Sequence, residues 1–187
     1  MSDFLRCLVG MFAAVAPFGA LATLNVGKGP SPDRRWAVLS PLAAFAALAG
    51  AALVNGPLLD WLSISPESFQ LAAGAAMAPL AARLMLAGDS MPAPRSLPSY
   101  AWLAPLAVPL LAGPSSVIAA ISYAARFNTG EAVLASAIVC ALTAALFAAA
   151  PRLERVPQVL VQTLARLSGG LLVLIAVEMV LDGVHSV

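Results

Sequence analysis

Two hydrophobic stretches of the chain contain residues that would interrupt a helix, next to polar groups that could bind a small solute. Proline removes a backbone N–H donor and leaves a carbonyl without its helical partner. The new helix ends carry partial charges that can hold a polar or zwitterionic ligand. The candidate substrate-binding residues in these two stretches are Pro17, Gly19, Pro109, Gly113, Pro114, Ser115 and Ser116. The alternative interpretation is a pair of proline-kinked helices packed through small residues.

An acidic side chain, Glu178, lies inside the last hydrophobic stretch, four residues before Asp182 on the same helix face. Ionisable groups in membrane-spanning segments are costly, which makes Glu178 a candidate for coupling transport to a proton or another cation. The alternative is an outer-interface residue whose carboxylate reaches water. The sequence leaves both interpretations open.

Catalytic and metal chemistry have few candidate residues in this chain. His185 is the one histidine, and Cys7 and Cys140 both lie in apolar segments. We therefore expect no catalytic triad, no metal site, no cofactor and no disulfide, and we predict that the protein is not an enzyme. The formal net charge of +1, without a basic stripe, argues against a nucleic-acid partner.

The composition indicates that lipid, not water, surrounds most of the chain. Of 187 residues, 61% are hydrophobic and only 10% are charged, against about 25% charged in soluble domains. We predict an all-α membrane protein, because separate apolar runs must satisfy their backbone groups internally. Its six transmembrane helices are expected at about 4–24, 36–59, 66–87, 100–124, 130–150 and 158–182.

The first of these segments resembles a signal peptide in length, but Asp3 offsets Arg6 in the part that should be basic, so we interpret it as a span. The other basic residues predict the orientation. Eight of the ten lie in or beside the first, third and fifth loops: Lys28, Arg34, Arg35, Arg83, Arg95, Arg152, Arg155 and Arg166. The positive-inside rule then places these loops in the cytoplasm and both termini outside.

The spans repeat with an offset of 95 residues. Gly74 matches Gly169, and the second span matches the fifth. Three spans per repeat is an odd number, so the two halves should cross the membrane in opposite senses. We predict a single integral membrane domain over 1–187, built from two inverted three-helix repeats, about 1–95 and 96–187, with broken first and fourth helices.

Small residues in the third and sixth spans predict close helix packing. The candidates for this role are Gly74, Gly169 and Gly170.

Four motifs resemble those of the MarC family of integral membrane proteins. They are APFGALATL at 16–24, ISPESFQLAAG at 64–74, PLAVPLLAGPSS at 105–116 and GGLLVLIAVEMVLDG at 169–183. The chain departs from the family's usual pattern at Ala20, Ala22 and Ser115, where asparagine, proline and glycine are common. The resemblance covers essentially the whole chain. It implies six spans, a bacterial inner membrane and kinship with lysine exporters, and some members are assigned transport of neutral amino acids of the alanine and glycine type.

These observations favour a secondary transporter that moves a small neutral solute, such as an amino acid, around the two broken helices. The alternative is a non-transporting membrane scaffold or assembly subunit made of the same helices. The expected partners are membrane lipids and a small-molecule substrate. Association between copies of the chain is left open.

Overall fold

The computed structural model describes residues 3–26, 34–87, 111–153 and 158–185. Every regular element in these ranges is a helix, which confirms the all-α prediction. The helices are α1 (Asp3–Val15), α2 (Pro17–Val26), α3 (Arg34–Leu62), α4 (Pro66–Ala87), α6 (Pro114–Arg126), α7 (Thr129–Leu153) and α8 (Gln158–His185).

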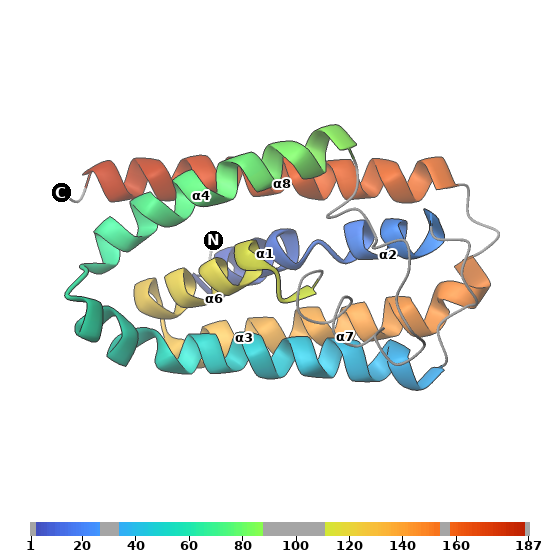
Figure 1. Ribbon diagram of the computed structural model, residues 1–187, viewed down its shortest axis with the longest axis horizontal. Helices are drawn as coiled ribbons and strands as arrows, with labels where there is room; N and C mark the ends of the chain where they lie inside the picture. Colours follow the sequence, from blue (N-terminus) through green and yellow to red (C-terminus); the bar gives the residue numbers. More distant parts are fainter. Residues whose placement is uncertain (1–2, 27–33, 88–110, 154–157, 186–187) are drawn as a thin grey trace.

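The shorter helices lie between two pairs of long ones (Figure 1). Helices α3 and α7 run side by side along one side of the molecule, and α4 and α8 along the other. Helices α1, α2 and α6 occupy the middle layer, where α1 contacts α6, α7 and α8. The bundle therefore places its discontinuous helices in its interior.

Burial distinguishes the first span from the other long helices. In an apolar window of 18 residues within Asp3–Leu21, 61% of the residues are buried, against 33–39% in the corresponding windows of the other four helices long enough to span a membrane. Those four expose large apolar side chains instead, such as Leu53, Leu86 and Leu174. Such faces suit hydrocarbon and not water, so the chain is a multi-pass membrane protein whose outer helices contact lipid.

The predicted spans agree with the described helices wherever the two can be compared. The structure has five helices of sufficient length and apolarity in its described part, and these correspond to the first, second, third, fifth and sixth predicted spans. The fourth span was expected at about 100–124. Its second half is α6, and residues 100–110 lie outside the described ranges.

Prolines in this fold either begin a new helix or lie within a helix that continues past them. Pro41, Pro57 and Pro79 lie inside α3 and α4, which continue past them. Pro17 and Pro114 instead occupy the first position of a new helix, where the missing N–H costs nothing. The interruption at Ala16 and Pro17 lies in the first span, as the sequence predicted, and α6 begins at Pro114 within the predicted fourth span, whose residues 100–110 lie outside the described ranges.

Candidate functional site

The break in the first span is made by one residue. Ala16 separates α1 from α2 and has a φ of 46°, in the left-handed region that L-residues other than glycine seldom occupy. Its N–H donates to the carbonyl of Phe12 at 3.1 Å, and its own carbonyl accepts from Ala20 at 3.1 Å. Pro17 cannot donate to the carbonyl four residues before it. The break therefore leaves carbonyls at the end of α1 that need partners from elsewhere.

The break in the fourth span precedes α6. Gly113 is the N-cap residue, with extended backbone, and Pro114 begins the helix. The Ser116 hydroxyl donates to the Leu111 carbonyl at 2.7 Å and also lies 3.1 Å from the Gly113 carbonyl. Ser116 is 1% exposed, so its side chain satisfies the carbonyls of its own break within the protein interior.

A hydrogen bond joins the two breaks. The Ser115 hydroxyl donates to the Ala14 carbonyl at 3.3 Å, across 101 residues of sequence. Pro17, Gly19 and Gly113 are buried around this junction, whereas Pro114 is exposed. The structure thus brings six of the seven predicted substrate-binding residues to two breaks that meet, and Pro109 lies outside the described residues.

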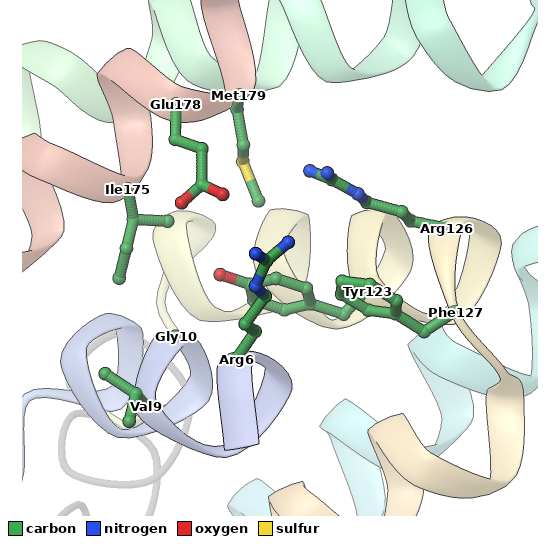
Figure 2. Close-up of a pocket in the computed structure, with 9 residues that line it drawn as sticks. All are labelled: Arg6, Val9, Gly10, Tyr123, Arg126, Phe127, Ile175, Glu178 and Met179. Atoms are coloured by element: carbon green, nitrogen blue, oxygen red, sulfur yellow. The ribbon is translucent and has the colours of Figure 1, made fainter. Parts of the chain in front are cut away.

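A cavity of about 100 Å³ lies away from this junction, toward the opposite ends of α1 and α6. It is enclosed by three helices, with Arg6 and Gly10 from α1, Tyr123 from α6, and Glu178 and Met179 from α8. Figure 2 shows the Glu178 carboxylate, the Arg6 guanidinium and the Tyr123 hydroxyl directed toward the same space. We call this space the outer cavity, after the side of the membrane on which the predicted orientation would place it. The predicted ion-coupling residue therefore lines a cavity together with two cationic side chains, Arg6 and Arg126.

The charges around the outer cavity are unequally partnered. Arg126 forms an ion pair with Asp182, which links α6 to α8, and its guanidinium lies 5.3 Å from the centre of the Phe127 ring. Tyr123 stacks on the same ring at 6.0 Å. Within the described ranges, Arg6 and Glu178 have neither an ion pair nor a hydrogen bond. Two opposite charges thus face one space without neutralising each other directly.

The predicted packing glycines have different surroundings. A Cβ added to Gly74 would lie 2.6 Å from the Ala176 carbonyl oxygen, and one added to Gly169 would lie 2.5 Å from the Met85 backbone nitrogen. These two glycines, with Gly183 against Leu71, allow α4 and α8 to touch backbone to backbone. Gly170 has no atom within 4 Å of its added Cβ and takes no part in this seam.

Comparison with known proteins places this arrangement in a family. The family model of MarC family integral membrane proteins matches residues 1–187. The chain belongs to the MarC family. It is 26% identical over 199 residues to the UPF0056 membrane protein MJ1677 of Methanocaldococcus jannaschii, covering 98% of this chain and 96% of that protein. No solved structure matches the chain.

The MarC resemblance and the hydrophobic pattern did not single out most of the outer cavity. Eight of the ten basic residues were assigned to one side of the membrane, and Arg6 and Arg126 were the two on the other side. That unusual placement was the signal that could have drawn attention to them. Tyr123 carried none, because an aromatic residue near a span end is typical of an interface anchor. The sequence pattern did not single out Glu131 either, which lies in the first turn of α7 and does not line the cavity. One of its carboxylate oxygens is buried and has no hydrogen-bond partner among the described residues.

Metal ligands do not gather in the described part of this MarC protein. No three His, Cys, Asp or Glu side chains come together there in a way that could hold an ion.

Proposed function

We propose that this MarC protein is a secondary transporter that moves a small neutral solute, such as an amino acid of the alanine or glycine type. The observation that carries the proposal is the junction of two helix breaks inside the bundle, linked by Ser115 and Ala14. An unpaired backbone group in hydrocarbon costs several kcal/mol, so each break is destabilising by about that much unless its backbone groups find partners. Discontinuous helices that meet in the interior are the usual location of solute sites in secondary transporters.

The packing of the long helices supports an inverted-repeat architecture within this proposal. In the α4–α8 seam, Gly74 lies against Ala176 and Val180, while Gly169 lies against Leu84 and Met85. The residue numbers of the contacting positions increase along α4 while they decrease along α8, so the two helices are antiparallel. An offset of 95 residues interchanges Gly74 with Gly169 and Val180 with Met85, so the contacts of one glycine are the approximate image of the other's. We propose a pseudo-two-fold axis in the membrane plane that relates the two halves.

The proposed orientation places both termini outside the bacterial inner membrane. The end of the bundle where α3 meets α4 carries acidic Asp60 and Glu67, whereas basic Arg34 and Arg35 begin α3 at its other end. A reporter that is active only in the cytoplasm, fused after Val187, should be inactive, and one active only outside should be active. A fusion after Ala87, at the end of α4, should give the reverse pattern. An active cytoplasmic reporter at Val187 would mean that the orientation is inverted.

The test of transport uses purified protein in proteoliposomes loaded with unlabelled alanine or glycine. We expect exchange with external labelled alanine or glycine, and accumulation when a pH gradient is imposed. Liposomes with the Gly113→Leu variant provide the matched control, because a large side chain at this buried break should block the path. Equal uptake by protein-free, Gly113→Leu and wild-type liposomes would contradict the proposal.

A non-transporting scaffold is the second candidate, and one observation favours it. The hydroxyls of Ser115 and Ser116, proposed as solute ligands, already donate to backbone carbonyls at the breaks. A solute at the junction would have to displace these bonds or use the backbone groups beside them. A folded wild-type protein that exchanges no solute in proteoliposomes would support the scaffold.

A further inference from the structure

We propose that the outer cavity binds the two charged ends of a small zwitterion, with Arg6 and Tyr123 holding its carboxylate and Glu178 its ammonium group. The inference deepens the proposed transport function by giving its solute a first binding site, on the outer side of the breaks. The inference is argued from the size of the cavity, from the charges of Arg6 and Glu178, and from the direction of these two side chains and that of Tyr123.

The chemistry of the lining matches both ends of such a ligand. A guanidinium presents several N–H donors in a plane that suits a carboxylate, and a phenol adds one further donor. Tyr123 is 6% exposed, yet no described group accepts a hydrogen bond from its hydroxyl, which faces the cavity. Glu178 offers only acceptors when ionised, which suits an ammonium group.

The charge balance favours a neutral dipolar ligand over an ion. Arg6 and Arg126 contribute two positive charges, and Glu178 and Asp182 two negative charges, so the four groups sum to zero. The Arg126–Asp182 pair is closed by its own contact, which leaves one positive and one negative group for the ligand. A simple anion would satisfy Arg6 and leave Glu178 repelled, and a simple cation would do the opposite.

The size of the cavity limits the ligand to a few atoms. A closed apolar cavity of about 150 Å³ holds benzene, which has six non-hydrogen atoms. The outer cavity, with about 100 Å³, has room for fewer atoms inside, and it opens to the surface where Arg6 and Glu178 are exposed. Glycine and alanine, with five and six non-hydrogen atoms, would fill this space and reach slightly into its opening, whereas the larger side chain of leucine would protrude well beyond it.

Binding of named probes to the purified wild-type protein tests the inference without any mutation. Calorimetric titrations would compare glycine and alanine with acetate, methylamine and leucine. We expect glycine to bind at least about tenfold more tightly than acetate or methylamine, because each lacks one charged contact. Acetate binding as tight as glycine would show an anion site on Arg6, and absence of glycine binding would show no site; either result overturns the inference.

Charge-removing variants then assign the two ends of the ligand. Arg6→Gln and Glu178→Gln should each weaken glycine binding about tenfold or more, and Tyr123→Phe should weaken it roughly threefold to tenfold. Arg83→Gln and Glu67→Gln, which remove the same charges from α4 outside the cavity, should change the affinity less than about twofold. In addition, Arg6→Gln should keep or raise the weak methylamine affinity, because it removes the positive charge that repels a cation beside Glu178, and this result separates lost recognition from misfolding.

Transport and binding measured on the same variants separate the two proposals. If wild-type liposomes transport glycine and both charge variants keep the wild-type KM and affinity, the cavity inference fails while the transporter remains. If wild-type protein binds glycine in an Arg6- and Glu178-dependent way but never transports it, the cavity inference stands and the proposed transport fails.

Discussion

Helix α8 meets its neighbours differently on its two faces. Toward α4, Gly169 and Gly183 let the two backbones approach so closely that an added methyl group has no room. Toward α1 and α6, Ile175, Glu178 and Met179 line a cavity with charged walls. A seam without free space holds two helices in one register, because every displacement creates overlap or a void. We therefore expect α4 and α8 to move as one unit, and relative motion to occur where α8 faces α1 and α6.

The largest effect should come from adding a methyl group to the seam. Gly169→Ala places a Cβ 2.5 Å from the Met85 backbone nitrogen, an atom that cannot move without shifting α4. Overpacking of this kind costs about 1–3 kcal/mol, which corresponds to a melting temperature several degrees lower in a chain of this size. Thermal unfolding of the purified protein in detergent measures the change.

The neighbouring glycine provides the matched control for the seam. Gly170→Ala meets no atom within 4 Å and improves helix propensity by up to about 1 kcal/mol. Its melting temperature should equal or exceed that of the wild type. Equal destabilisation by the two substitutions would mean that the seam is not held by close backbone contact.

The next effect concerns the charged face of α8. If Glu178 carries the coupling proton, Glu178→Gln should abolish accumulation driven by a pH gradient while exchange of solute continues at saturating concentration. Labelled alanine in proteoliposomes measures both activities. Glu67→Gln, which removes an acidic group at the start of α4, should leave both intact. Full accumulation by Glu178→Gln would return Glu178 to an interfacial role.

The smallest effect should come from the bond between the two breaks. Ser115→Ala removes a neutral hydrogen bond of 3.3 Å to the Ala14 carbonyl, worth about 1 kcal/mol. We expect roughly a fivefold change in exchange rate and little change in melting temperature. Ser116→Ala should lower the melting temperature more, because it leaves the Leu111 carbonyl without its donor in a fully buried place. The opposite order would show that the link between the breaks is the more important bond.

The sequence predicts the helices of this protein well because span length and apolarity are local properties. The positions of the breaks are also partly predictable from the sequence, because proline and glycine occur at them. Local chemistry could not distinguish Pro17, which begins a helix, from Pro41, Pro57 and Pro79, which lie within one. That choice depends on whether neighbouring segments offer partners for the freed carbonyls, as Ser115 does for Ala14.

The candidate site was predicted less completely, for a related reason. Glu178 was found because a carboxylate in an apolar span is unusual by itself. Arg6 and Tyr123 are ordinary residues near span ends, and only the packing of three helices brings them beside Glu178. The roles expected for Ser115 and Ser116 could not anticipate their backbone bonds, because the acceptors are carbonyls whose positions the sequence does not specify.

The left-handed backbone of Ala16 has a consequence for the equilibrium between conformers of the first span. A non-glycine residue at a φ of 46° costs about 1–2 kcal/mol, and a continuous helix through Pro17 would cost about 3 kcal/mol. The local backbone terms of the bent and the straight forms therefore differ by only about 1–2 kcal/mol. We therefore expect the angle between α1 and α2 to be set by the packing of these helices against their neighbours and not by the backbone of Ala16 and Pro17.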